Sequence, residues 1–272
     1  MAELDNNRMV RAFADLRQAG KKALVPFITA GYPDLDTTVA LLRDFQARGV
    51  RICELGIPFS DPIADGPVIQ NSYTECLSAG ITSDKILAAV RQYRSAGGSL
   101  ALAAMVSYSI IFRHDAANYL AALAKAGFDA AIIPDLPLEE AATAEPAARQ
   151  AGLCLVMLVA PTTDPSRRQE IARHSRGFIY YISIAGITGQ RTCLPDATIA
   201  AVAELRTHTD APVCVGFGIS TPEMVREVCR VADGAIVGSA IVARLTAGKS
   251  APRDKLVKDT GAFVSELLAP IA

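Results

Sequence analysis

Eight short β-like runs recur along the chain, and a helical pattern follows each of them. The runs lie at residues 23–29, 50–55, 100–106, 130–133, 153–159, 177–183, 212–215 and 234–237. Several are apolar throughout and do not alternate, as expected when both faces of a parallel sheet are covered. Eight βα units within about 250 residues favour an α/β fold of the (β/α)8 type, a TIM barrel, over an open doubly wound sheet.

Helical spacing supports the same architecture. Amphipathic stretches lie at residues 38–46, 84–93, 116–125, 139–150, 168–174, 199–207 and 222–231. Residues 4–18, ahead of the first run, also have helical spacing, and we expect this extra N-terminal helix to cover the barrel floor. Because no Gly/Ser-rich or Pro-rich linker divides the chain, residues 1–272 are predicted to form one domain.

Composition excludes several classes of function. The net charge of -1 and the pI near 6.3 do not favour nucleic-acid binding, which usually depends on a basic surface. The longest nearly apolar stretch, 100–112, is too short for a membrane span, which needs roughly 20 residues. The polar, acidic first residues argue against a signal peptide, so we expect a cytoplasmic protein.

The cysteine pattern bears on redox state and metals. The six cysteines show no C-x-x-C spacing and have no nearby histidine, which favours buried thiols over a disulfide or a metal site. Nucleotide-binding glycine motifs are also lacking, so the sequence predicts no metal and no nucleotide cofactor.

Two acids follow the second run. Glu54 ends that run, and Asp65 lies on the Gly/Pro-rich loop after it. Because a carboxylate is costly to keep at the mouth of a buried strand, such a group is usually either paired or chemically useful. Two acids converging on one pocket would suit acid/base chemistry on a small molecule. The alternatives are a salt bridge to a neighbouring helix for Glu54 and an ordinary Asp-Gly turn for Asp65.

Glycine-rich loops follow the last three runs. They read GITG (186–189), GFGIS (216–220) and GSA (238–240), and the Gly238-Ser239 pair opens a short helix. Glycine lets the backbone approach an anion closely, and helix N-termini direct amide groups at it. Three such loops on consecutive strands favour a phosphate site over simple left-handed turns.

Aromatic side chains near these loops are pocket candidates. Phe27, Tyr180 and Phe217 are placed to line a flat pocket, with packing in the strand core as the alternative. The three histidines fall on helical stretches far from the loops, so we expect them to be surface groups.

Taken together, these residues resemble the tryptophan synthase alpha chain family. The resemblance covers nearly the whole chain and is most specific in the segment ELGIPFSDPIADGPVIQ (54–70). Further matches are VPFITAGYP (25–33), PDLP (134–137), GITG (186–189), GFGIS (216–220) and GSAIV (238–242).

The resemblance implies retro-aldol cleavage of indole-3-glycerol phosphate to indole and glyceraldehyde 3-phosphate in tryptophan biosynthesis, a lyase reaction. Glu54 matches the family's general acid/base, and Asp65 matches the acid that binds the indole N–H. Tyr180 matches a tyrosine near the acid/base. The phosphate-site matches are Gly189, Gly218, Gly238 and Ser239.

The family resemblance also implies a partner. A beta chain, joined in an α2β2 heterotetramer, would carry the pyridoxal phosphate, and none is expected in this chain. Pro58, Asp61 and the 188–193 segment match contact and gating elements. A stand-alone lyase that releases free indole is the alternative, and a non-catalytic phosphate-binding barrel is a third interpretation.

One segment departs from the family pattern. Residues 105–110 read MVSYSI, where the family usually has a Tyr-Tyr-Asn-Pro-like stretch. We expect this difference to affect the substrate pocket or the beta-chain contact, because the catalytic acids are unchanged.

Overall fold

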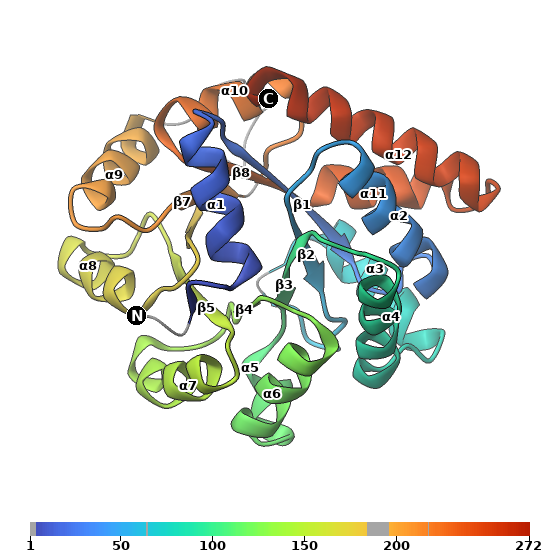
Figure 1. Cartoon of the computed structure of the whole chain (residues 1–272), viewed down its shortest axis with the longest axis horizontal. Coiled ribbons are helices and arrows are strands. Elements are labelled where there is room, and N and C mark those ends of the chain that lie inside the picture. Colours follow the sequence, from blue (N-terminus) through green and yellow to red (C-terminus); the bar gives the residue numbers. More distant parts are fainter. Residues whose placement is uncertain (1–3, 64, 184–195, 217) are drawn as a thin grey trace.

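Eight parallel strands close into a barrel in the computed structural model, which describes residues 4–63, 65–183, 196–216 and 218–272 (Figure 1). Each strand pairs with its neighbour in sequence, and β1 pairs with β8 to complete the ring. The strands are β1 (Ala23–Thr29), β2 (Ile52–Gly56), β3 (Ala101–Met105), β4 (Ala130–Ile132), β5 (Cys154–Val159), β6 (Ile179–Ile182), β7 (Val213–Gly216) and β8 (Gly234–Val237). The predicted TIM barrel is therefore confirmed.

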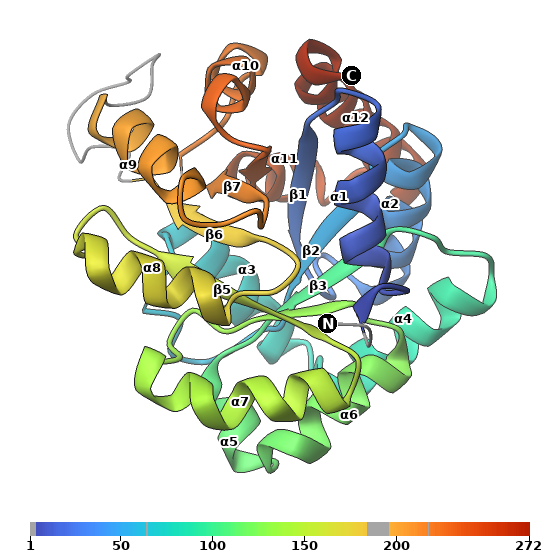
Figure 2. The ribbon, with the colours of Figure 1, turned by 60° about the vertical axis from the view of Figure 1, so that its left-hand side comes forward.

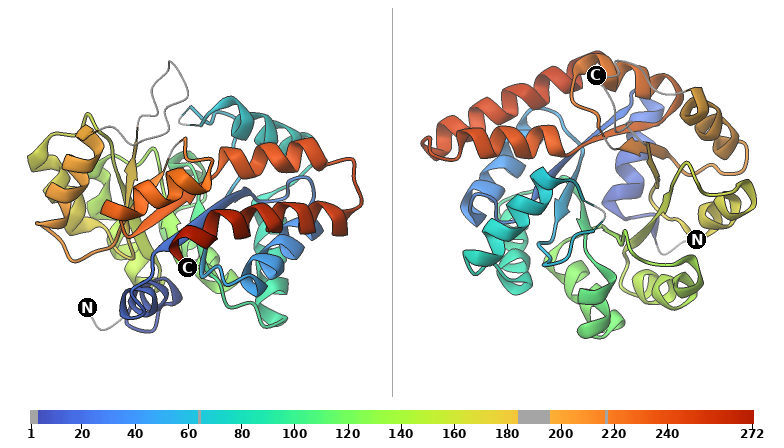
Figure 3. Two further views of the ribbon diagram at one scale, coloured as in Figure 1. Left: turned by 90° about the horizontal axis from the view of Figure 1, so that it is seen from above. Right: turned by 180° about the vertical axis from the view of Figure 1, so that it is seen from behind.

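The helices form an outer layer around this ring, as Figure 1 and the view from behind in Figure 3 show. They are α1 (Arg8–Gln18), α2 (Leu35–Ala47), α3 (Pro67–Ser78), α4 (Ser83–Ser95), α5 (Tyr108–Arg113), α6 (Ala116–Ala126), α7 (Leu138–Gln150), α8 (Pro165–His174), α9 (Asp196–Arg206), α10 (Pro222–Val231), α11 (Ser239–Gly248) and α12 (Arg253–Leu268), followed by the short η2 (Ala269–Ile271). No helix among these described elements is long and apolar enough to cross a membrane.

Inward-facing side chains of unequal size fill the barrel. Tyr180 on β6 and Phe178 just before it are large, whereas β3 contributes Ala101 and Ala103 to the same inner cluster and β4 contributes Ala130 and Ile132. Because a close-packed interior has no room for large groups on every strand, the alanines make space for the aromatic rings. The small residues at Ala103 and Ala130 also lie in register with Glu54 of β2, which leaves room beside that acid.

The N-terminal helix closes one end of the barrel. Phe13 of α1 packs on Phe178, with ring centroids 5.6 Å apart, and Met9 is fully buried in the inner cluster. Asn7 caps α1 and donates from Nδ2 to the carbonyls of Asp129 and Gly152, which ties the helix to loops that precede two strands. Figure 2 and the left panel of Figure 3 show α1 at the opposite end of the barrel from α3. The expected floor helix is present. An active site would therefore lie at the opposite, carboxyl end of the barrel.

Three helices were not predicted. The sequence reading included no helix at α3, α5 or α12, and α3 and α5 both lie at the carboxyl end of the barrel, directly after β2 and β3. Active sites in these barrels form at that end, so two of the three missed helices border the candidate site.

Candidate active site

Glu54 is an inward-facing acid buried inside the barrel. Its side chain is 1% exposed, and Oε2 has no hydrogen-bond partner. The alternative of a salt bridge to a neighbouring helix is not supported, because no cation of the described chain lies within ion-pair distance of it. Burial raises the pKa of Glu54 from 4.5 to about 8, and the nearby Asp65 carboxylate adds to the increase. The group is therefore a proton donor at neutral pH.

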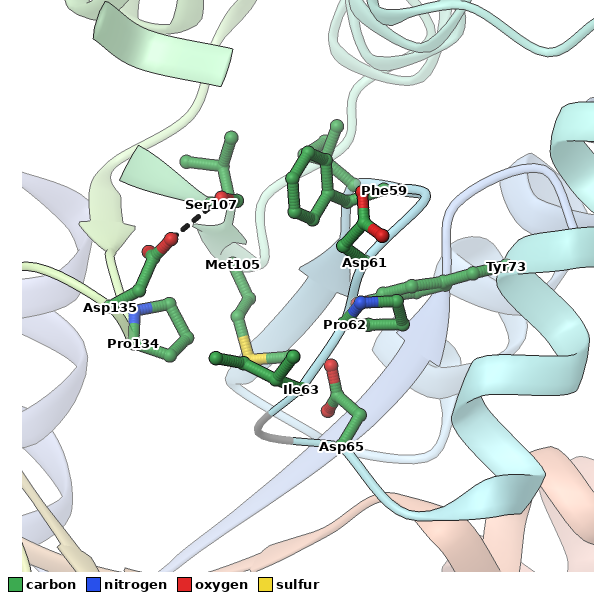
Figure 4. Close-up of a pocket in the computed structure, with 12 residues that line it drawn as sticks. Phe59, Asp61, Pro62, Ile63, Asp65, Tyr73, Met105, Ser107, Pro134 and Asp135 are labelled. Atoms are coloured by element: carbon green, nitrogen blue, oxygen red, sulfur yellow. Dashed lines mark hydrogen bonds between the residues drawn. The ribbon is translucent and has the colours of Figure 1, made fainter. Parts of the chain in front are cut away.

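Asp65 lies on the loop between β2 and α3, and Gln70 fixes the backbone of that loop. Gln70 Nε2 donates to the Asp65 carbonyl at 2.7 Å and to the Pro62 carbonyl at 3.2 Å. The Asp65 amide also bonds the Pro62 carbonyl, at 3.1 Å. The carboxyl group enters an open hollow at the end of the barrel (Figure 4). Partial burial raises its pKa from 3.8 to about 6, so it is mostly ionised at neutral pH.

The two acids influence each other and two tyrosines. Burial is the main reason that the pKa values of Tyr73 and Tyr180 lie well above 10, and the charges of both Glu54 and Asp65 raise them further. Neutral phenol groups from α3 and β6 thus lie near the pair of acids. The arrangement of one protonated and one ionised carboxyl group is typical of sites that combine an acid with a charge-stabilising group.

Phe27 lies beside Glu54 in the sheet. The two residues are register partners on β1 and β2, and Phe27 is 2% exposed. A carbon added to Gly56, two residues beyond Glu54, would lie 2.5 Å from both the Phe27 ring tip and the Tyr73 hydroxyl. A carbon added to Gly216 would lie 2.5 Å from the Tyr180 hydroxyl. Glycine at these two strand ends lets the aromatic side chains reach over the backbone.

The described residues of the proposed phosphate site, Gly218, Gly238 and Ser239, lie directly after β7 and β8. Gly218 has φ +75°, a conformation that favours glycine. Gly238 precedes α11, which begins at Ser239, and a carbon added to Gly238 would lie 3.2 Å from Phe27 Cδ1. The first amides of α11 have no helix carbonyl to bond and are available to an anion. Gly189 and Phe217 lie outside the described residues, as does the 188–193 segment.

The unusual segment after β3 begins α5. Ser107 is the N-cap of this helix, and its Oγ donates to Asp135 Oδ2 at 2.7 Å. The Tyr108 amide donates to Asp135 Oδ1, also at 2.7 Å, and the Ser109 amide donates to Ser107 Oγ at 3.2 Å. Asp135 belongs to the PDLP motif after β4, so the segment is held by a matched acid even though its own sequence departs from the family pattern.

The hollow itself joins residues from three loops. Figure 4 shows side chains from the loop after β2, from the end of β3 and from the loop after β4 around one opening. Its lining residues are Ile57, Phe59, Asp61, Pro62, Ile63, Asp65, Tyr73, Met105, Val106, Ser107, Pro134 and Asp135. Sequence reasoning missed Gln70, Tyr73 and Met105. Pro67 at the first turn of α3 was an available signal for a helix that would carry the first two of these residues.

Comparison with known proteins identifies the family. The family model described as "Tryptophan synthase alpha chain" matches residues 13–268. The chain is 43% identical over 263 residues to the tryptophan synthase alpha chain of Chloroflexus aggregans, with 97% of each chain covered. It is 45% identical over 235 residues to that of Rhodopirellula baltica, with 86% of this chain and 84% of the relative covered. The chain belongs to the tryptophan synthase alpha chain family.

Solved structures agree with this assignment to the tryptophan synthase alpha chains. Subunit alpha from Legionella pneumophila str. Paris superposes with a TM-score of 0.89 at 34% identity, covering 97% of this chain and 98% of that one. A chain of tryptophan synthase from M. tuberculosis, in an aminoacrylate-bound form, gives 0.85 at 31% identity, covering 98% and 100%. The barrel is therefore that of the family.

The residues that the sequence of this tryptophan synthase alpha chain predicts to contact a partner, Pro58 and Asp61, lie on the loop after β2. Pro58 is buried within the chain, whereas Asp61 is exposed and accepts a 2.7 Å hydrogen bond from Ser60 Oγ. Ile63, on the same loop, is 89% exposed, and Phe112 at the end of α5 is 74% exposed. The described residues contain no cluster of three side chains suited to a metal ion, and their five cysteines are free and buried.

Proposed function

We propose that this protein cleaves indole-3-glycerol phosphate to indole and glyceraldehyde 3-phosphate, as a lyase of tryptophan biosynthesis. Family membership supports the reaction, and the observation that carries it is the pair of carboxyl groups in different protonation states. Glu54 is buried with a pKa near 8, and Asp65 borders the hollow with a pKa near 6. Retro-aldol cleavage of an indole side chain needs an acid and an anion together.

Glu54 acts as the general acid and base in this proposal. In its protonated form it donates a proton to C3 of the indole ring, which gives an indolenine-like cation. The resulting carboxylate then takes the proton from the hydroxyl on the adjacent side-chain carbon. The bond between that carbon and C3 breaks, its electron pair returns to the ring, and an aldehyde leaves. Glu54 ends protonated and ready for another turnover.

Asp65 supports the cationic intermediate. Its carboxylate accepts a hydrogen bond from the indole N–H and offsets the positive charge that develops on the ring. Phe27, Tyr180 and Phe217 are assigned to the indole pocket. The opposite end of the substrate, its phosphate, is assigned to main-chain amides near Gly189, Gly218, Gly238 and Ser239, where the helix α11 begins.

The beta chain is the proposed partner, in an α2β2 assembly. Indole released here would be consumed in the beta chain, which would hold the pyridoxal phosphate. No cofactor is assigned to this chain. Pro58 and Asp61 are proposed contact residues, and the cytoplasm is the proposed compartment. Nothing in the comparisons favours the stand-alone lyase over this arrangement.

A direct assay tests the proposal. The protein is mixed with indole-3-glycerol phosphate, with and without purified beta chain, and indole release is followed. We expect turnover in the wild type and a large stimulation by the beta chain. Glu54→Gln should lower kcat by at least about a thousandfold while the fold persists, because the proton donor is lost. Near-normal turnover of Glu54→Gln at saturating substrate would refute the acid/base assignment.

A further inference from the structure

The Tyr73 hydroxyl has no hydrogen-bond partner among the described residues at the edge of the proposed active site. The residue lies on α3, two turns after Asp65, and is 3% exposed. Its Oη makes no hydrogen bond to any part of the chain that the structure describes, and the Asp65 carboxyl group also makes none. A tyrosine whose ring is this buried usually directs its hydroxyl at a partner, so the partner is sought in the space that the hydroxyl faces.

The position of the hydroxyl limits the possible partners. Tyr73 crosses over Gly56, where a single added carbon would meet its Oη at 2.5 Å. Gly56 and Glu54 point to the same side of β2, because side chains alternate along a strand. Tyr73 and Asp65 also line the same hollow, and Figure 4 shows both reaching into it. The hydroxyl therefore lies over Gly56, on the Glu54 side of β2, and beside the hollow that Asp65 lines.

Charge identifies which acid is the nearer partner. After burial, the Asp65 carboxylate is the largest cause of the raised pKa of Tyr73, ahead of Glu54. Because the phenol stays neutral far above physiological pH, it is a permanent donor, whereas an ionised carboxylate only accepts. A donor beside a carboxylate favours its charged form.

We propose that Tyr73 is a positioning residue for Asp65: in the substrate complex its hydroxyl donates to one carboxylate oxygen while the other oxygen accepts the indole N–H. This inference rests on the proposed function. The phenol–carboxylate contact holds Asp65 ionised and aimed at the ring. Glycine at position 56 is what gives the Tyr73 ring its path to this place.

The variant Tyr73→Phe tests the contact, because it keeps the ring and removes only the hydroxyl. We expect kcat to fall about tenfold with KM nearly unchanged, as for loss of a hydrogen bond to a charged group. The ascending limb of the kcat profile should also move to higher pH by about one unit, because the Asp65 carboxylate in the complex loses its donor. The groups that face Asp65 are Glu54 from β2, Tyr180 from β6 and Tyr73 from α3, with Asp61 and Asp135 around the hollow.

A matched control is available on β6. The Tyr181 hydroxyl is buried and likewise has no hydrogen-bond partner among the described residues, but the charges that affect its pKa are those of Arg168 and Glu204. Tyr181→Phe should leave the kcat profile unchanged. A uniform loss of activity in Tyr73→Phe with no shift of the ascending limb would reduce the residue to a packing role and overturn the proposal, as would wild-type kinetics.

A second measurement does not depend on turnover. The titration of the Asp65 carboxyl carbon is followed by NMR in wild type and in Tyr73→Phe, each saturated with an indole-alkyl phosphate that lacks the side-chain hydroxyls. We expect a higher Asp65 pKa in the variant, and equal values would overturn the contact. If the wild type did not cleave the substrate, the proposed function would be wrong, and this comparison would still decide the role of Tyr73.

Discussion

Glu54 illustrates how a single residue sets both chemistry and stability. The folded protein holds its pKa near 8, against 4.5 for an ordinary glutamate. The native state therefore binds more protons than the unfolded state between these two values. Because stability rises with pH only where the unfolded state binds more protons, this group makes stability fall as pH rises from about 4.5 through about 8.

Replacing this acid should reverse that effect. Glu54→Gln removes the ionisation and is expected to raise the melting temperature by several degrees at pH 9, where the wild type must keep a buried charge. At pH 5 both side chains are neutral, and the difference should be small. Thermal melts of both proteins across this range test the prediction. A constant difference at all pH values would show that Glu54 does not titrate between these limits.

The sequence was sufficient to predict the two acids of the candidate site but not all of the side chains around them. Glu54 was identifiable because an acid at the end of a buried strand is unusual, and Asp65 because the segment 54–70 resembles the family's. The structure brings both acids to one end of the barrel. Tyr73 was hidden because a tyrosine on a helix is ordinary core packing until the strand beneath it is known. The roles of these residues stay predictions until the kinetics are measured.

At the scale of elements, strands were easier to predict than the helices around the site. Continuous apolar runs between turns indicate buried parallel strands, and all eight were found. The helix α3 was hidden because its buried face, Ser72, Tyr73 and Cys76, is mixed in polarity. The helix α5 follows β3 so closely that its apolar residues were included in a longer apolar stretch. In contrast, α12 has buried residues at helical spacing and could have been recognised.

The helix α3 also supports the loop that carries Asp65. Gln70 holds two loop carbonyls at once, and a leucine of similar size would leave both without this donor. We expect Gln70→Leu to lower kcat by roughly tenfold, because a displaced acid is poorly oriented. Substrate cleavage assays test this, with circular dichroism to check folding. Gln92→Leu, at an exposed position of α4, is the control and should behave as wild type.

On the scale of the whole molecule, the helix that closes the barrel and the proposed active site lie at opposite ends of the barrel. The floor is closed by α1, whereas the other end holds Glu54 on β2 and, on the loop after β2, Asp65 and the exposed apolar side chain of Ile63. Phe112 on α5, after β3, is a second large apolar group in contact with solvent. We propose that Ile63 and Phe112 contribute to the contact with the beta chain.

Phe112 gives the sharpest test of this contact, because it does not line the hollow that holds Asp65. Phe112→Ser should leave indole-3-glycerol phosphate cleavage by the isolated chain within about twofold of wild type, since an exposed substitution has little effect on folding. Stimulation by the beta chain should require at least about tenfold more beta chain, as for loss of an apolar anchor at an interface. Titrating beta chain into each protein measures this, with Lys21→Ser at the opposite, floor end as the control. If Phe112→Ser and wild type needed the same beta-chain concentration for half-maximal stimulation, the beta chain would not contact Phe112. The loop after β2 would then be the main contact element on this chain.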